Sequence, residues 1–242
     1  MSKAPDAPIL AVRDLCAGYG QVNVLDHVSI TVETGAITAL IGANGAGKTT
    51  IMNAIAGLID PTSGSVEIDG TECLGQPSHI RVARGLTLIP EGRMVFARMT
   101  VEENLTLGAI TPGARADRSR RLADVYRRFP RLEERRSQLA GLMSGGEQQM
   151  LALGRGLMSG PRLILMDEPT LGLAPIMVTR IFETIEELRA AGFSILLAEQ
   201  NARRALGIAD HACVIENGKI TITGKGQEMM DAPEVRRAYL GV

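Results

Sequence analysis

The sequence predicts an α/β fold: a parallel-sheet core, an antiparallel β layer beside it and an inserted helical segment. Three observations support this prediction. Short apolar runs alternate with helical stretches through the middle of the chain, which is typical of βαβ units. Segments near the N-terminus alternate polar and apolar residues, as half-buried antiparallel strands do. A glycine-rich loop, residues 42–49, lies between an apolar run and a helical stretch.

That loop fits the pattern G-x-x-x-x-G-K-S/T, which binds phosphate groups. Residues 37–41 before it form an apolar run typical of a buried strand, and a helix is expected from Thr49 to Ala56. Glycines let the backbone point its N–H groups inward, and the helix start adds positive partial charge. We expect Lys48 to reach the β- and γ-phosphates and the Thr49 hydroxyl to ligate Mg²⁺. The expected phosphate-binding residues are Gly42, Ala43, Asn44, Gly45, Ala46, Gly47, Lys48, Thr49 and Thr50.

Composition argues against several other classes of protein. The 242 residues carry a net charge of -1, 3% aromatic residues and no tryptophan, so nucleic acid is not an expected partner. Cys16, Cys73 and Cys213 form no C-x-x-C pair, which argues against a zinc site and suits a reducing cytosolic compartment. Residues 1–8 lack the apolar centre of a signal peptide, and no apolar run approaches a membrane span. Any membrane role is therefore expected to come through a partner.

The residue pattern in the N-terminal third of the chain predicts the antiparallel β layer. Residues 9–15 and 28–32 alternate as half-buried strands do, and residues 65–69 form a strand that ends in Asp-Gly, a hairpin signal. Tyr19 lies between two glycines. It is either a turn aromatic at the sheet edge or a platform for a flat ligand such as adenine.

The middle of the chain predicts a short strand followed by helices. Residues 86–89 are a buried strand that stops at a proline, with Glu91 in the following loop. Residues 100–103 fit a capping box that opens a helix to about Gly108. Between residues 115 and 136 the chain is rich in arginine, with apolar residues at helical spacing, namely Leu122, Val125, Phe129 and Leu132. We interpret this stretch as helical with a solvated charged face, rather than as a nucleic-acid patch.

A second glycine-containing loop, in residues 143–149, leads directly into a helix expected from Glu147 to Met158. Its free backbone donors make it either a second anion site or a plain helix N-cap. The residues concerned are Ser144, Gly145, Gly146 and Glu147.

Residues 163–168 read as a buried strand that ends in two carboxylates. Such strands deliver acids to the carboxyl edge of a parallel sheet, where ligands bind. We expect Asp167 to hold Mg²⁺ through water and Glu168 to orient or polarise an attacking water. The alternative is a charged strand terminus without a ligand.

The last third of the chain continues the alternation of helices and buried strands. It predicts a helix at 176–191, a buried strand at 193–198 with Gln200 just beyond its end, and a hairpin around Asn217-Gly218. Short helices finish the chain, and no internal repeat or long linker is present.

Taken in this order, the motifs resemble the ATP-binding subunit of an ABC transporter over nearly the whole chain. Residues 42–49 match the Walker A loop, 143–148 the signature sequence and 163–167 the Walker B strand. Residues 171–174 fall at the D-loop, and Tyr19 falls at the aromatic position that stacks on adenine. The resemblance implies a P-loop NTPase (RecA-like) fold with ATP and Mg²⁺ as cofactors.

It also implies roles and boundaries. One ABC ATPase domain would span 1–242, with the core and β layer in 9–90 and 160–242 and a helical subdomain in about 91–158. The implied catalytic residues are Glu168, Gln200 and Lys48, and the implied metal-binding residues are Thr49, Glu91 and Asp167. A head-to-tail dimer would place Ser144, Gly145 and Gly146 of one subunit over the ATP of a second ABC ATPase subunit, which is the same or a different chain.

Within the family, the chain resembles the branched-chain amino acid importers, and urea and amide importers are similar. The segments that carry this resemblance are residues 89–96, 100–105, 171–175, 198–202 and 238–242. It implies permease subunits as partners, a solute-binding protein as an indirect one, and a peripheral location on the cytoplasmic face of the inner membrane.

Three positions depart from the commonest ABC residues. Glu91 replaces the Q-loop glutamine, Gln200 the switch histidine, and Met143 the leucine of the signature. An amide donates hydrogen bonds but does not become a cation, so Gln200 is expected only to support turnover. These departures leave open a subunit that binds ATP but hydrolyses it weakly. A chain of 242 residues has no room for the second ATPase unit or coiled-coil arm of non-transport ABC ATPases, and a GTPase would need an Asn-Lys-x-Asp motif, which is absent.

Overall fold

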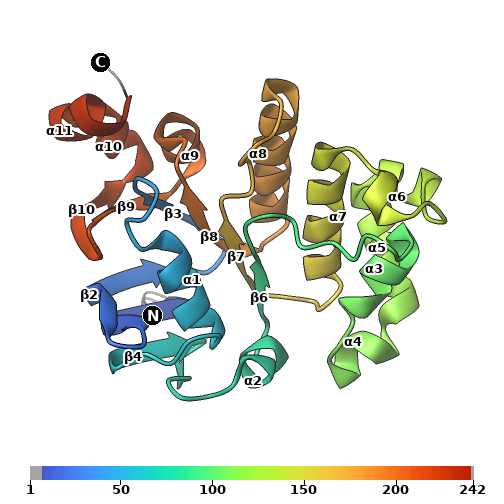
Figure 1. Ribbon diagram of the computed structural model, residues 1–242, viewed down its shortest axis with the longest axis horizontal. Coiled ribbons are helices and arrows are strands. Elements are labelled where there is room, and N and C mark those ends of the chain that lie inside the picture. The colour runs from blue at the N-terminus through green and yellow to red at the C-terminus, as the bar shows by residue number, and fades with distance from the viewer. Residues whose placement is uncertain (1–6, 241–242) are drawn as a thin grey trace, which may run out of the picture.

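The computed structural model describes residues 7–240, so most of the segment 1–8 and the last two residues of 238–242 lie outside it. Within the described residues, the named strands form two sheets (Figure 1). The larger sheet has the order β10 (Lys219–Lys225), β9 (His211–Glu216), β3 (Ile37–Ile41), β8 (Ser194–Glu199), β7 (Leu163–Asp167) and β6 (Leu86–Ile89). The smaller sheet has the order β2 (Val22–Val32), β1 (Leu10–Tyr19), β4 (Ser63–Ile68) and β5 (Thr71–Glu72).

The smaller sheet is antiparallel, and the larger sheet is parallel except for the β9–β10 hairpin. The predicted parallel core and antiparallel layer are therefore confirmed. The helices are α1 (Lys48–Ala56), α2 (Ser78–Ala83), α3 (Val101–Leu107), α4 (Pro112–Ala116), α5 (Arg118–Arg128), α6 (Pro130–Glu134), α7 (Gly145–Leu157), α8 (Pro175–Ala190), α9 (Ala202–Ile208), α10 (Gly226–Asp231) and α11 (Pro233–Val235). A 3₁₀ turn spans Ala140–Leu142, and a π-helical turn spans Arg236–Leu240.

The central strands face a hydrophobic core on each side. In β7, Ile164 and Met166 pack into one core while Leu163 and Leu165 pack into the other. One core lies between the two sheets and contains α1, and the other is covered by the remaining large helices. Because both faces are buried, β7 is apolar up to its final aspartate instead of alternating with polar residues. Figure 1 shows α3 to α7 gathered beside the β6 edge of the larger sheet.

Two of the predicted helix starts, those of α3 and α7, have full capping boxes. The Thr100 side chain accepts from the Glu103 N–H, and the Glu103 carboxylate accepts from the Thr100 N–H. Ser144 and Glu147 form the same pair at the start of α7. Each box satisfies backbone N–H groups that would otherwise lack a partner in the first helical turn.

Two short helices, α2 and α9, were not predicted from the sequence. In α9, the Asn201 side chain accepts from the Arg204 N–H and caps the helix. The helix α2 carries Arg81, which is 1% exposed and donates to the Ala54 and Ile55 carbonyl oxygens at 2.7 and 2.8 Å. Arg81 therefore caps the C-terminal end of α1, a contact between distant segments that no local pattern indicates. In the described part of the chain, no helix is both long and apolar enough to cross a membrane.

Candidate nucleotide-binding site

The candidate site lies where strands of the larger sheet end together. The loop after β3 leads to α1, the end of β7 carries Asp167 and Glu168, and the loop after β6 carries Glu91. These segments surround a pocket of about 490 Å³. Its lining residues are Val24, Asn44, Gly45, Gly47, Lys48, Thr49, Thr50, Glu91, Glu168 and Leu171. Most of the predicted phosphate-loop residues and two of the predicted acids thus share one cavity.

Glycines shape the loop between β3 and α1. Gly45 and Gly47 have φ angles of 80° and 112°, in the left-handed region that side chains disfavour. At Gly42, a Cβ atom would lie 2.6 Å from the Ile215 carbonyl oxygen. The loop can therefore pass against β9 and curl toward α1 only with glycine at these positions.

Lys48 is 4% exposed and has three partners. Its Nζ donates to the carbonyl oxygens of Gly42 and Ala43 at 2.7 and 3.1 Å. The same Nζ lies 2.9 Å from Glu168 Oε1. The ammonium predicted to contact phosphates is thus also in direct contact with the carboxylate predicted to act on water, which the sequence did not indicate.

Glu168 follows the end of β7 in an unusual conformation. Its φ angle is 44°, which is rare for a residue with a side chain. Its N–H donates to the Ala198 carbonyl oxygen at 2.9 Å, which ties this turn to β8. Strained backbone of this kind is typical of functional sites, and here it accompanies the contact with Lys48.

Asp167 is 2% exposed, and its Oδ1 has no hydrogen-bond partner among the described residues. Burial raises the pKa of Asp167, and the nearby Glu168 and Glu91 carboxylates raise it further. A side-chain hydrogen bond with Thr49 acts in the opposite direction. A buried carboxylate oxygen without a partner, beside a hydroxyl and other acids, forms a set of oxygen donors that suits a hard divalent cation.

Glu199, at the end of β8, was not assigned a role from the sequence. It is 2% exposed and accepts from Thr170 Oγ1 at 2.7 Å and from the Asn201 N–H at 3.3 Å. Burial raises its pKa. Glu199 therefore holds the segment just after Glu168 in place. Its position at the end of a buried strand, like that of Asp167, was the only signal in the sequence.

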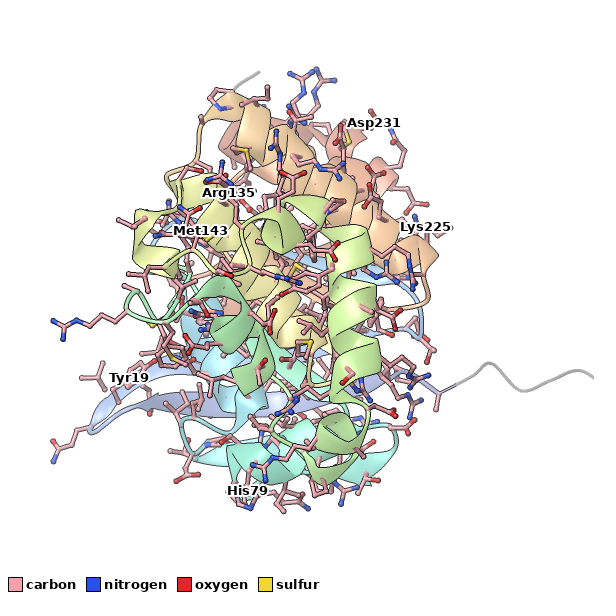
Figure 2. The ribbon with its side chains drawn as sticks, turned by 90° about the vertical axis from the view of Figure 1, so that its right-hand side faces the viewer. Tyr19, His79, Arg135, Met143, Lys225 and Asp231 are labelled. Atoms are coloured by element: carbon pink, nitrogen blue, oxygen red, sulfur yellow. The ribbon has the colours of Figure 1, made fainter. Side chains whose placement is uncertain are left out.

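Several predicted residues do not line the pocket, namely Tyr19, Gly42, Ala43, Ala46, Asp167 and Gln200. Tyr19 is 49% exposed, near the outer end of the β1–β2 hairpin (Figure 2). Gln200 follows β8 and is exposed. Val24 of β2 and Leu171 line the pocket instead, and both were missed as pocket residues because their approach depends on the packing of distant segments.

The segment 144–147 also lies outside the pocket. Ser144 and Glu147 satisfy each other in the capping box, and Arg135 Nε lies 3.2 Å from Glu147 Oε1. The hydrogen bond from the Ser144 N–H lowers the pKa of Glu147. Ser144 is exposed, so its loop is available on the surface of a single chain.

Comparison with known proteins identifies the family. The ABC transporter family model matches residues 25–171. The high-affinity branched-chain amino acid transport ATP-binding protein BraG of Pseudomonas aeruginosa is 49% identical, and the match covers 92% of this chain and 95% of that protein. A probable branched-chain amino acid transport ATP-binding protein, LivF of Archaeoglobus fulgidus, is 35% identical over 97% of this chain and 99% of its own length. The lipopolysaccharide export ATP-binding protein LptB of Haemophilus influenzae is 34% identical over 96% of this chain and 97% of its own length.

Solved structures agree with this result. A nucleotide-free ATP-binding cassette of an ABC transporter covers 98% of this chain with a TM-score of 0.85 and 29% identity. An ATP-binding cassette in its ADP conformation gives the same TM-score, identity and coverage. In both cases the whole of the solved chain is covered. The chain therefore belongs to the ABC transporter family, as one of its ATP-binding subunits, which hydrolyse ATP.

Proposed function

We propose that this chain powers a membrane importer of branched-chain amino acids from the cytoplasmic face of the inner membrane. The observation that carries the proposal is the 49% identity with the Pseudomonas branched-chain amino acid subunit over 92% of this chain. The lipopolysaccharide export relative has only 34% identity over a similar length. The difference in identity favours amino acid import over lipopolysaccharide export.

The site geometry supports a mechanism in which ATP binding frees the base. The backbone N–H groups of residues 43–48 and the start of α1 would bind the phosphates. Lys48 would then turn from Glu168 to the β- and γ-phosphates, because two phosphate charges attract it more strongly than one carboxylate. Glu168, now without its counter-ion, would accept the proton of the attacking water. The 2.9 Å contact between Lys48 and Glu168 thus keeps the base neutralised until substrate arrives.

The same geometry supports Mg²⁺ as a cofactor. Thr49 and Asp167 lie in hydrogen-bonding contact, and Glu91 is close enough to Asp167 to raise its pKa. We propose that these three residues hold the ion, directly or through water. When bound with ATP, Mg²⁺ would neutralise charge that develops on the phosphates.

A second ATP-binding subunit is proposed to complete the site. The exposed Ser144 begins α7, a helix of 13 residues whose N-terminus offers backbone donors and positive partial charge. Ser144, Gly145, Gly146 and Glu147 lie outside the pocket of their own chain, so they would contact an ATP held by a partner cassette. Tyr19 and Gln200 are proposed to contact adenine and the γ-phosphate, respectively, once the nucleotide and the partner cassette are in place.

A permease subunit is proposed to dock in an apolar groove of about 740 Å³ beside the loop that carries Glu91. Leu58, Met94 and Phe96 line it and are 58%, 64% and 51% exposed, respectively. Exposed apolar side chains gathered in one groove are typical of an interaction surface. The groove lies where the proposed helical subdomain, residues 91–158, meets the proposed core. A solute-binding protein would act on the other side of the membrane, through the permeases.

The proposal is tested by uptake of labelled leucine, isoleucine and valine in cells that lack this gene. We expect uptake to fall, to be restored by the wild-type gene and not to be restored by Glu168→Gln, although that variant accumulates normally. Uptake of labelled urea serves as the control for a related importer. Unchanged amino acid uptake with reduced urea uptake would reassign the substrate, and no change in either would contradict import of both.

A further inference from the structure

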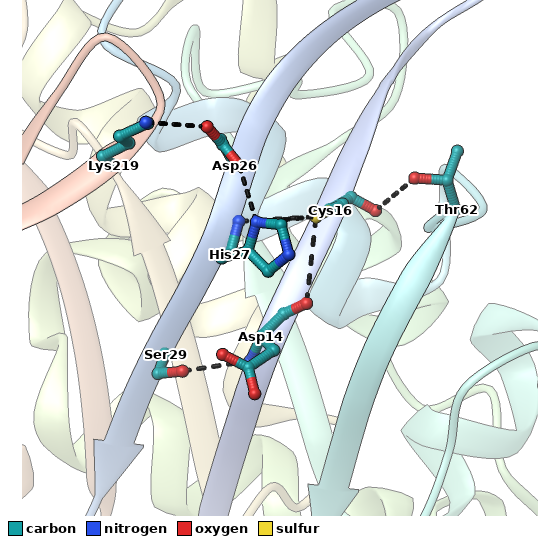
Figure 3. A network of polar contacts seen from close by, with 7 residues as sticks. All are labelled: Asp14, Cys16, Asp26, His27, Ser29, Thr62 and Lys219. Carbon is teal, nitrogen blue, oxygen red and sulfur yellow. Dashed lines mark hydrogen bonds and ion pairs between the residues drawn. The ribbon is translucent and has the colours of Figure 1, made fainter.

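We propose that Cys16, Asp26 and His27 form a binding site for a borderline-soft divalent metal ion of the Zn²⁺ class, on the exposed side of the smaller sheet. A thiol sulfur, a carboxylate oxygen and a ring nitrogen lie within 4.8 Å of one another there. Figure 3 shows the three side chains converging between β1 and β2. None of them lines the nucleotide pocket, so the site is independent of the proposed function.

A β-bulge brings the three residues together. In the β1–β2 pair, Leu15 pairs with Val28 and Ala17 pairs with Leu25. The single residue Cys16 therefore faces two consecutive residues, Asp26 and His27. In a regular strand those two side chains would point to opposite faces of the sheet. The bulge, with a His27 φ angle of 53°, aims both toward the sulfur.

The distances favour a shared ligand over a proton relay. His27 Nδ1 lies 3.8 Å from Cys16 Sγ and 2.6 Å from Asp26 Oδ1. A Cys–His–Asp relay needs the thiol on one ring nitrogen and the carboxylate on the other. Here both contact the same nitrogen, so no relay can form. Three potential ligands that converge on one point are what a metal ion requires.

The geometry needs little adjustment to hold such an ion. Zinc–ligand bonds of about 2.0–2.3 Å at tetrahedral angles place ligand atoms roughly 3.3–3.6 Å apart. The Sγ to Nδ1 distance of 3.8 Å is already close to this range. The Asp26 and His27 side chains must separate slightly, and both can do so because they are 49% and 70% exposed.

Neighbouring residues hold the backbone and the carboxylate in place. Lys219 Nζ lies 2.9 Å from Asp26 Oδ2, which leaves Oδ1 for the ion. On the other side of β1, the Thr62 N–H and hydroxyl both donate to the Cys16 carbonyl oxygen, at 2.7 and 3.1 Å. Such outer contacts fix the position of the ligands.

The ligand set selects the metal. Thiolate and imidazole favour Zn²⁺ and Co²⁺, whereas Mg²⁺ and Ca²⁺ prefer oxygen ligands. Three protein ligands leave a fourth position for water. A zinc site was not expected from the sequence because its cysteines form no C-x-x-C pair. Ligands that come from two strands and meet only through a bulge leave no such spacing pattern.

The test is a Co²⁺ titration of the reduced full chain, without nucleotide and with excess Mg²⁺ to occupy oxygen sites. We expect one Co²⁺ per chain, a thiolate-to-cobalt charge-transfer band in the near ultraviolet, and displacement by one equivalent of Zn²⁺. Cys16→Ser should abolish the band. His27→Ala and Asp26→Asn should each weaken Zn²⁺ affinity by about 10-fold or more.

Matched controls are Cys213→Ala, which removes a buried thiol, and His79→Ala, which removes another exposed histidine. Both should bind Co²⁺ like the wild type. Circular dichroism confirms that each variant is folded before titration. A wild-type chain without the band would overturn the proposal, as would a band that survives Cys16→Ser or affinities equal in His27→Ala and His79→Ala.

Discussion

Buried charges at single residues explain how the nucleotide pocket is prepared for its ligand. Lys48 and Glu168 are 4% and 8% exposed and neutralise each other at 2.9 Å. Asp167 has a side-chain hydrogen bond with Thr49 but no ion pair among the described residues, and its Oδ1 makes no hydrogen bond to any of them. An ionised carboxylate with one oxygen unpartnered in this position costs stability until a cation or a further donor reaches that oxygen. The protein thus carries a local stability cost at the residue proposed to hold Mg²⁺.

Replacement of Asp167 by asparagine should therefore stabilise the nucleotide-free chain at neutral pH. Burial raises the pKa of Asp167 above its ordinary value of 3.8, so the folded chain holds this proton more tightly than the unfolded chain. The contribution of Asp167 to wild-type stability is therefore most favourable below the ordinary value and is lost as pH rises through the raised pKa. For Asp167→Asn we expect a Tm higher by roughly 2–8 °C at pH 7.

The expected gain in Tm should shrink as the pH is lowered, because the wild-type carboxyl then becomes protonated and neutral. Differential scanning calorimetry of both chains at a series of pH values, from pH 7 downward, measures the difference in Tm. Added MgATP should reverse the order, stabilising the wild type more than the variant. A variant that is less stable than the wild type at every pH would show that ionised Asp167 is already satisfied in the nucleotide-free chain.

At the residue scale, prediction from sequence succeeded where the chemistry is local. Gly45, Gly47 and Lys48 belong to one short loop, so their spacing alone placed them at the pocket. The contact of Glu199 with Thr170 joins the end of β8 to the loop after β7, and the cluster of Cys16 with Asp26 and His27 depends on a bulge. Neither can be detected from spacing, because each depends on which strands pair and in what register.

At the scale of elements, predictability followed the strength of local signals. The strand 163–167 was recognised because a fully buried strand is an uninterrupted apolar run with a sharp end. The helices α3 and α7 were recognised by their capping boxes. By contrast, β1 and β2 extend beyond their predicted limits to Tyr19 and from Val22, because bulges interrupt the alternation that defines a strand in sequence. The short helix α2 was not predicted because it is held by the contact of Arg81 with α1, and no local sequence pattern indicates that contact.

The two capping boxes allow a matched test of the α7 loop. Ser144→Ala and Thr100→Ala remove the same cap from α7 and α3, respectively, and each should cost about 1 kcal/mol. For a chain of this size, that lowers Tm by roughly 2–4 °C. Only Ser144→Ala should also lower ATP hydrolysis, because only its hydroxyl and helix start are proposed to contact ATP on the partner cassette.

Thermal unfolding and phosphate release under the same conditions measure both effects. Equal loss of activity in the two variants would reduce the role of Ser144 to helix capping. Full activity in Ser144→Ala, with the expected loss of stability, would show that the Ser144 hydroxyl is not needed to contact ATP. Thr100→Ala is a well-matched control because the two capping boxes have nearly the same geometry. The distance from the backbone nitrogen to the carboxylate oxygen is 2.8 Å at Thr100 and 2.9 Å at Ser144.

At the scale of the whole molecule, one chain contains two helix starts that are proposed to bind phosphate, and only one of them lies at the pocket. The start of α1 lies at the pocket, and the start of α7 lies outside it. In a head-to-tail pair, each α7 start would cover the pocket of the other chain. ATP would then belong to both chains, and its binding energy would hold the pair together.

Glu168→Gln tests this arrangement, since glutamine keeps the size of the side chain but does not accept a proton at neutral pH. We expect the variant to elute from a sizing column as single chains of 25.8 kDa without nucleotide and at twice that mass with MgATP. Lys48→Ala in the same background should abolish the shift, because the phosphates lose their buried ammonium. If the Glu168→Gln chain binds ATP and still elutes as a single chain, pairing with itself is contradicted and the second cassette must be a different chain. Dimerisation that persists in the Lys48→Ala background would show instead that contacts other than ATP hold the chains together.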